Sequence, residues 1–113
     1  MGGFLSKTTL DGNVETMLLS ILQAGSSYGY QIVQDLNEKA PHLLDFGEGT
    51  VYPVLHRMEK RGLIAADWRK GETGRRRKYY SLTDQGRKVL AANREQWCGL
   101  VEAMSAVLEP KTS

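Results

Sequence analysis

The sequence has few of the residues that build disulfide-bonded, metal-binding or membrane-spanning proteins. Its 113 residues include one cysteine, Cys98, and two histidines, His42 and His56. A single cysteine forms no internal disulfide and supplies no cysteine-based metal site, so we expect neither a metal nor another cofactor. No apolar run in the sequence approaches the roughly 20 residues of a membrane span, and nothing resembles a secretory leader. These absences favour a protein of the reducing cytoplasm, away from the membrane.

Groups that could perform catalysis are equally scarce. His42 falls in a predicted loop and His56 on the outer face of a predicted helix, and neither has a nucleophile or a set of ligands beside it. No spacing of acidic residues places two carboxylates on one concave wall. We therefore predict that the chain is not an enzyme.

The formal charge of the chain is small but unevenly distributed. The net charge is +2, yet residues 48–88 hold eleven basic and five acidic side chains, whereas residues 1–47 hold two basic and five acidic ones. A basic middle third between acidic flanks points to a polyanion held against one face. A solvated basic loop is the alternative that charge alone leaves open.

Two amphipathic helices are predicted in the first 40 residues. In "LDGNVETMLLSILQAG" apolar residues recur at intervals of three and four, as on a helix with one buried face, and Gly25 stands at the usual C′ position. We expect Ser26 or Ser27 to cap a second helix, "YGYQIVQDLNEKA", which Pro41 ends. The buried stripes are Leu10, Val14, Met17, Leu18, Ile21 and Leu22 in the first helix, and Ile32, Val33 and Leu36 in the second.

The segment "GEGTVYPVLHRMEKRG" predicts a third helix, after the short extended link "HLLDF", although glycines and a proline crowd its start. Val51, Leu55 and Met58 define its core face, with Val54 at the edge, and Gly62 ends it. The first turns of a helix tolerate poor helix formers, because the first four N–H groups have no intrahelical acceptors. Glycine also lets the backbone approach a phosphate closely. We interpret the segment as a helix whose N-terminus meets an anion.

Farther along the chain the apolar period changes from helical to alternating. The runs "LIAADWRK" and "RRRKYYSL" flank the turn "GETG" and predict a β-hairpin. Thr83 is a natural N-cap for a last helix that runs to about Glu109. Ile64, Ala66 and Trp68 share one side of the first strand, and Lys78, Tyr80 and Leu82 share one side of the second.

This order of elements predicts a mainly α fold with a small β hairpin (α+β), arranged as a winged helix-turn-helix with a long C-terminal helix. The last helix would be roughly 39 Å long at 1.5 Å per residue, too long for so small a domain to bury by itself. We expect a flexible N-terminus (1–9), a DNA-binding domain (10–82), a C-terminal dimerisation helix (83–109) and a tail (110–113).

The face of the third helix opposite its core stripe carries the groups expected of a DNA reader. A recognition helix needs hydrogen-bonding side chains near its N-terminus, where it enters the major groove. For this helix alone, ordinary solvated side chains are an equally good interpretation. The outward positions are Gly49, Pro53, His56, Arg57 and Lys60, flanked by Thr50 and Tyr52.

The hairpin strengthens the DNA interpretation, because four consecutive cations stand beside its glycine-rich turn: Arg75, Arg76, Arg77 and Lys78. Binding phosphates through them would release counterions and make the affinity depend strongly on salt. Alternating side chains cannot all face one groove, so we expect two or three of the four to contact the DNA backbone. We interpret the neighbouring Tyr79 and Tyr80 as cross-strand packing residues, with Trp68 as a candidate partner.

The last helix carries a heptad-like seam that favours a two-fold dimer. A dimer would also present two recognition helices to a pseudo-palindromic site. Trp97 is either a packing anchor in that interface or one wall of a pocket between subunits, with Val101 and Met104, for a flat apolar effector. The seam residues are Leu90, Trp97, Val101, Met104 and Leu108, widened by Leu100 and Val107.

The stretches "EGTVYPVLHRMEKRGLI" and "GRRRKYYSLTDQGRKVL", together with "YGYQI", resemble the PadR family of bacterial transcriptional regulators over roughly residues 10–108. The single C-terminal helix is similar to that of its smaller subgroup. The resemblance implies a homodimeric winged-helix repressor whose C-terminal helix packs on the N-terminal helix, which adds Leu10 and Val14 to the interface. Some relatives release DNA on binding phenolic acids or flat hydrophobic drugs, so a small aromatic or hydrophobic effector is implied.

The family's DNA-contact motifs match this chain at two places. Gly49, Thr50, Tyr52 and Pro53 match its recognition helix, and residues 75–80 match its wing. From "YGYQI" we add Tyr28 and Gln31 to the predicted DNA-contact set. The alternative function is a winged-helix interaction module that grips an acidic protein with the third helix and the wing.

Overall fold

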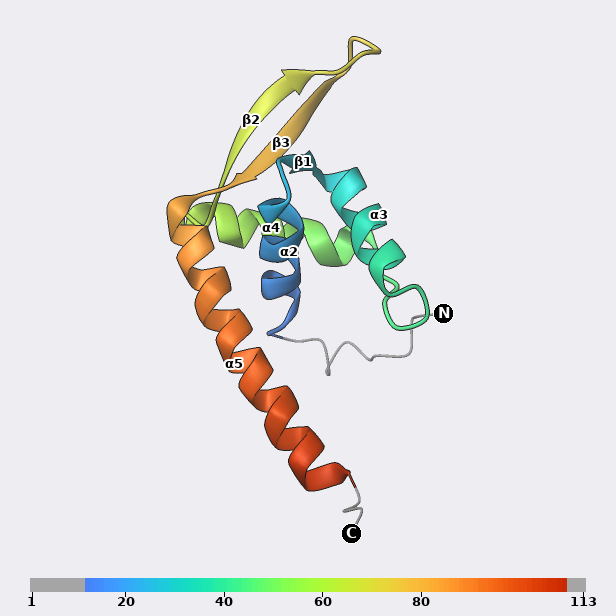
Figure 1. The fold of residues 1–113 in the computed structure, drawn as a ribbon. Coiled ribbons are helices and arrows are strands. Elements are labelled where there is room, and N and C mark those ends of the chain that lie inside the picture. The colour runs from blue at the N-terminus through green and yellow to red at the C-terminus, as the bar shows by residue number, and fades with distance from the viewer. Residues whose placement is uncertain (1–11, 110–113) are drawn as a thin grey trace.

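The computed structural model describes residues 12–109, and within them it confirms the predicted α+β architecture (Figure 1). The predictions for residues 1–9, Leu10 and residues 110–113 lie outside the described residues. The elements in order are α2 (Val14–Gln23), β1 (Ser27–Tyr28), α3 (Gly29–Lys39), α4 (Glu48–Lys60), β2 (Ile64–Lys70), β3 (Arg76–Leu82) and α5 (Asp84–Leu108).

Helices α2, α3 and α4 enclose the hydrophobic core on the faces that their apolar stripes predicted. Leu18, Ile32 and Leu55 are fully buried there. The link between α3 and α4 was predicted to be extended, but residues 41–43 form a turn that brings the Leu43 and Leu44 N–H groups to the Ala40 carbonyl (2.9 Å each). The link also contributes to the core through the buried side chains of Leu44 and Phe46. The side chain of Asn37 holds this link, because its amide donates to the Phe46 carbonyl (2.9 Å) and its oxygen accepts from the Phe46 N–H (2.7 Å).

The sheet has three strands in the order β1-β3-β2, so the predicted hairpin acquires an additional short strand. Ser27 pairs with Tyr80, and Tyr28 pairs with Tyr79. The prediction that Ser26 or Ser27 caps α3 was wrong: Tyr28 is the N-cap residue, and no side chain caps the helix. The backbone of residues 27–28 pairs with β3 instead, and so attaches the start of α3 to the wing.

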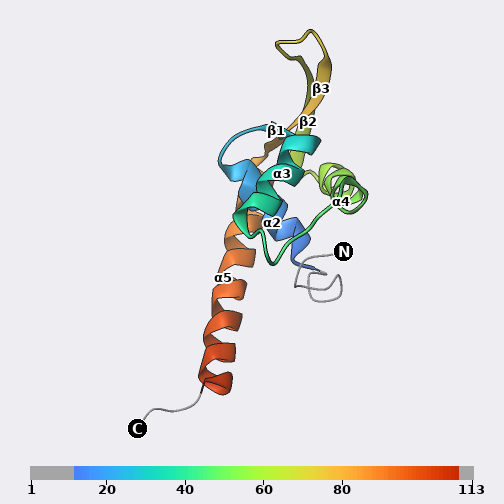
Figure 2. The ribbon, with the colours of Figure 1, turned by 90° about the vertical axis from the view of Figure 1, so that its right-hand side faces the viewer.

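The wing hairpin β2–β3 is antiparallel. Its register places the predicted face of β2 (Ile64, Ala66 and Trp68) on the same side of the sheet as the predicted face of β3 (Lys78, Tyr80 and Leu82). Ile64 pairs with Leu82, and Trp68 pairs with Lys78, so both sets of side chains point to the same side. The end of this face nearest the core is buried at Ile64, Tyr80 and Leu82. The far end projects beyond the helices (Figure 2).

Helix α5 begins as predicted and then extends away from the rest of the molecule (Figures 1 and 2). The Thr83 hydroxyl accepts from the Gly86 N–H (3.0 Å) and also lies 2.9 Å from the Leu63 carbonyl. Leu90 is fully buried, whereas the apolar residues of the last three turns are exposed. Between residues 12 and 109, no helix has the length and apolarity to cross a membrane.

Candidate nucleic-acid interface

Helix α4 presents the outward face that its sequence predicted. Val51, Val54, Leu55 and Met58 are buried, and the predicted reading positions on the other side are exposed. The N-cap is Gly47, with extended backbone, and among the described residues no side chain caps the first N–H groups of the helix. Pro53 lies inside the helix, where it removes the backbone bond to Gly49.

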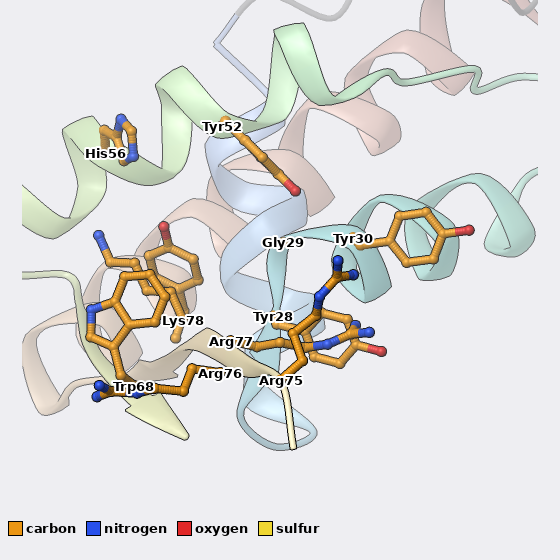
Figure 3. A pocket seen from close by; sticks show the side chains of 11 residues that line it. Tyr28, Gly29, Tyr30, Tyr52, His56, Trp68, Arg75, Arg76, Arg77 and Lys78 are labelled. Atoms are coloured by element: carbon orange, nitrogen blue, oxygen red, sulfur yellow. The ribbon is translucent and has the colours of Figure 1, made fainter. Parts of the chain in front are cut away.

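A cleft of about 560 Å³ separates α4 from the wing, with the start of α3 forming its third wall (Figure 3). Of the described residues that line it, none is acidic and four are the consecutive cations of the wing. The sum of these charges makes the cleft attractive to a polyanion. Its lining residues are Tyr28, Gly29, Tyr30, Tyr52, His56, Trp68, Arg75, Arg76, Arg77, Lys78 and Tyr80.

On one side of the wing, two arginines and two tyrosines pack in a row, with the two rings in the middle and one arginine at each end. The Arg77 guanidinium lies 4.3 Å from the ring centre of Tyr28, and that of Arg69 lies 4.7 Å from the ring centre of Tyr79. The two rings meet edge to face, with 5.3 Å between their centres. Arg69 also donates to Asp67 (2.9 Å) and to the Ser26 hydroxyl (3.2 Å), which anchors the row at its base. The contact with Tyr28 holds Arg77 in a fixed direction while leaving its charge available, whereas the charge of Arg69 is already paired with Asp67.

The other side of the wing faces α4, and the cations there have different partners. The Arg76 guanidinium lies 6.0 Å from the ring centre of Trp68. The Lys78 amine donates to Glu59 of α4 (3.1 Å) and lies 5.4 Å from the ring centre of Tyr80. The hydrogen bond to Glu59 raises the pKa of Lys78 above its ordinary value. Arg75 is exposed in the turn, and within residues 12–109 its side chain has neither a ring nor a carboxylate partner.

The predicted DNA contacts divide between two sides of α4. Tyr52 and His56 face the wing cleft, together with Tyr28 and the four wing cations. A second hollow, of about 400 Å³, lies on the other side, beside the start of α2. Gln31 and Lys60 line neither, and the Gln31 amide donates to Asp35 (2.9 Å). The predicted contacts that line the second hollow are Gly49, Thr50, Pro53 and Arg57.

Several residues of the cleft were not among the predicted contacts. Gly29, Tyr30 and Tyr80 enter it because the two-residue strand β1 brings the start of α3 against β3. A strand of two residues leaves no periodic signal in the sequence. Trp68 was expected to pack on Tyr79 or Tyr80, but the ring partner of Tyr79 is Tyr28, and Trp68 is 59% exposed opposite Lys78.

The seam on α5 is exposed where the chain leaves the core. Leu90 was predicted to belong to the dimer interface, but it is fully buried within one chain, so it has no surface to offer a partner. Val14 is half-buried against the core. A hollow of about 360 Å³ lies between α2 and α5, with Trp97 in its wall. The exposed seam residues are Trp97, Leu100, Val101, Met104, Val107 and Leu108.

No group of three His, Cys, Asp or Glu side chains within residues 12–109 is placed to hold a metal ion. Cys98 is exposed on α5. The chemistry of the described surface is therefore that of charge, aromatic rings and an exposed helix start. This surface is suited to holding a polyanion.

Comparison with known proteins agrees with this geometry. The family model described as "Transcriptional regulator PadR-like family" matches residues 18–92. A PadR-like transcriptional regulator from Bacillus cereus has a similar structure, with a TM-score of 0.83 at 30% identity, covering 93% of this chain and 100% of that one. A transcriptional regulator from Clostridium thermocellum has a TM-score of 0.82 at 32% identity, covering 93% and 99%.

A relative of known sequence points to the same class of protein. The transcriptional regulator YqjI of Escherichia coli is 31% identical over 85 residues, which are 75% of this chain. The match spans only 39% of YqjI, so most of that protein has no counterpart in the alignment.

Proposed function

The chain belongs to the PadR-like family of transcriptional regulators, and we propose that it acts as a homodimeric repressor that binds a pseudo-palindromic operator. Family membership by itself makes it a DNA-binding regulator of transcription and not an enzyme. The repressing action, the dimer, the operator contacts and an effector are the parts that we propose. Since such a regulator works on the chromosome, we also place it in the cytoplasm.

The observation that carries the proposal is the cationic cleft between α4 and the wing. One wall is the exposed face of a helix with an uncapped start, and the other is a hairpin with Arg76 and Arg77 held against aromatic rings. We propose that α4 enters the major groove and that the wing binds the flanking backbone. In this arrangement Thr50, His56 and Arg57 face the base edges, while Arg75 and Arg77 bind phosphates.

The exposed seam on α5 supports the proposed dimer. Large apolar side chains such as Trp97 and Val107 are 56% and 80% exposed, and they follow one another along a projecting helix. An exposed apolar stripe of this kind marks an interaction surface. A two-fold pairing through α5 would present two α4 helices to successive turns of the duplex.

We further propose that a small hydrophobic or aromatic molecule releases the repressor from its operator. The support is the hollow between α2 and α5, where the indole of Trp97 lies beside Leu100 and the polar side chains of Asn93 and Gln96. Most of the lining is polar, so a ligand there would stack on the indole and hydrogen-bond to the surrounding side chains. A ligand there would change how α5 packs on the DNA-binding helices.

The test is an electrophoretic mobility shift on the DNA upstream of the protein's own gene, followed by footprinting of any shifted fragment. We expect a salt-sensitive complex and two protected half-sites about one helical turn apart. Failure to shift any duplex at low salt, with the oligomer intact, would reject the proposal.

A further inference from the structure

The four consecutive cations of the wing do not have equivalent surroundings. Arg75 is exposed and Arg77 lies against a tyrosine ring, whereas Lys78 is bound to a carboxylate on another element. The Lys78 and Glu59 side chains are 31% and 35% exposed, so the pair is partly shielded from solvent. A charge already paired with a carboxylate gains less from a phosphate than an unpaired one does.

The Lys78–Glu59 contact joins the outer part of the wing to the recognition helix. Lys78 stands opposite Trp68 in the hairpin, nearer the turn than the buried pair Ile64 and Leu82. Glu59 lies in the last turn of α4, two residues after Arg57, the last of the proposed base contacts. On the other side of the hairpin, Arg69 reaches Ser26 and Arg77 reaches the Tyr28 ring. The hairpin is therefore held from both sides at this level.

We propose that Glu59 and Lys78 are a positioning pair that fixes the wing relative to the recognition helix, and that Lys78 does not bind a DNA phosphate. This inference rests on the proposed function, because it assumes that α4 and the wing engage one duplex together. Both elements then have to meet the DNA in a fixed relative orientation. An ion pair between them removes part of the ordering that binding would otherwise require.

The two possible roles of Lys78 predict different salt dependence. A phosphate contact releases counterions when it forms. Losing one contact therefore makes the fall of log affinity with log salt shallower by about 0.9. A positioning residue leaves that slope unchanged while the affinity falls. We expect Lys78→Gln to weaken binding by about two- to fivefold, the scale of one part-exposed ion pair, at constant slope. Arg75→Gln, the phosphate-contact comparison, should reduce the slope.

Substitution of Glu59 is the sharper test, because a positioning role and simple electrostatics predict opposite changes in DNA affinity. Removing a carboxylate near DNA should strengthen binding by simple electrostatics. If Glu59 positions the wing, Glu59→Gln should instead weaken binding by about two- to fivefold. The double variant Glu59→Lys with Lys78→Glu, which swaps the two charges, should recover most of the DNA affinity that either single variant loses.

A measurement on the free protein separates this inference from the proposed function. Hydrogen–deuterium exchange of wing amides in residues 68–78 should accelerate in Glu59→Gln and in Lys78→Gln, and remain unchanged in Lys70→Gln, a lysine of the same hairpin without this carboxylate partner. Unchanged exchange in both single variants would overturn the positioning role, whether or not the protein binds DNA. A reduced salt slope for Lys78→Gln, or tighter binding by Glu59→Gln, would also overturn it. Absence of DNA binding by the wild type would reject only the proposed function.

Discussion

The ring of Tyr52 lies directly against Gly29, so closely that a Cβ atom on residue 29 would stand 2.4 Å from Cε1 of that ring. Figure 3 shows the tyrosine reaching from α4 to the start of α3. Tyr52 is 38% exposed, so one part of it packs between the two helices while the rest borders the wing cleft. A single pair of residues therefore sets how closely the two helices of the helix-turn-helix approach each other.

Gly29→Ala should consequently push the Tyr52 ring out of its place between the two helices and weaken DNA binding. The added methyl group overlaps an aromatic ring, and overpacking of this kind costs about 1–3 kcal/mol of folding stability. Urea denaturation would measure the loss of stability, and a mobility shift would measure the loss of affinity. The matched control is the same change in a Tyr52→Ala background, where the overlap is absent. There Gly29→Ala should be neutral or stabilising; an equal cost in both backgrounds would contradict the prediction.

Alkaline pH should destabilise the protein through Tyr52. Burial, followed by the charge of Glu48 and by Tyr80, raises the pKa of Tyr52 above its ordinary value of 10.0. The folded state therefore retains the phenol proton at a pH where the unfolded chain has released it. This contribution to stability is complete below about pH 10 and is lost as the pH rises through the higher folded pKa.

Urea denaturation of the wild type and of Tyr52→Phe on both sides of pH 10 would measure this effect. The wild type should lose more stability than the variant, because Phe has no proton to release. Parallel losses in the two proteins would contradict it.

The order of the helices and of the two hairpin strands was predictable because each of these elements has a strong periodic signal. The short strand β1 has none, and the cleft was only partly predictable. The wing arginines and the outward face of α4 could be predicted from local sequence alone. Gly29 could not, since its role depends on Tyr52, 23 positions farther along the chain. The pairing of Lys78 with Glu59 likewise follows from the angle between wing and helix, which no local pattern encodes.

Gly86→Ala should be strongly destabilising. A Cβ at this position would lie 2.1 Å from the Leu63 carbonyl oxygen and 2.7 Å from the Leu82 side chain. The first contact is with backbone, which cannot rotate away, so the start of α5 would have to move from the sheet. We expect a loss of about 3 kcal/mol, at the upper end for overpacking. Gly99→Ala in the same helix meets nothing within 4 Å and should instead stabilise by about 0.5–1 kcal/mol. Thermal unfolding of both variants tests the contrast.

A charge in the α5 seam should prevent dimerisation. Val101 is 42% exposed among other apolar residues, and a Glu there would have to lose its hydration in any α5–α5 interface. We expect Val101→Glu to give a monomer in analytical ultracentrifugation and to bind the operator much more weakly, because each half-site would bind independently. Ala106→Glu places the same charge on the opposite face of the helix and should leave the dimer intact. A dimeric Val101→Glu protein would exclude this seam as the interface.

The hollow beside Trp97 should report ligand binding through that indole, once the other tryptophan is removed. Trp68→Phe leaves Trp97 as the only indole, and planar aromatic compounds that enter the hollow should quench its emission. If such a compound is the effector, the same concentrations should release the operator, because binding and release are linked through one coupling free energy.

Asn93 provides the control: its amide donates to Thr16 of α2 (2.9 Å), which connects the hollow to the DNA-binding helices. Because Asn93 also lines the hollow, Asn93→Ala should be compared at ligand concentrations that saturate the quenching, where the release of DNA should still be weaker. Quenching without release in the parent protein would make the hollow a binding site with no regulatory role, and unchanged emission across a broad panel would leave Trp97 as an interface residue alone.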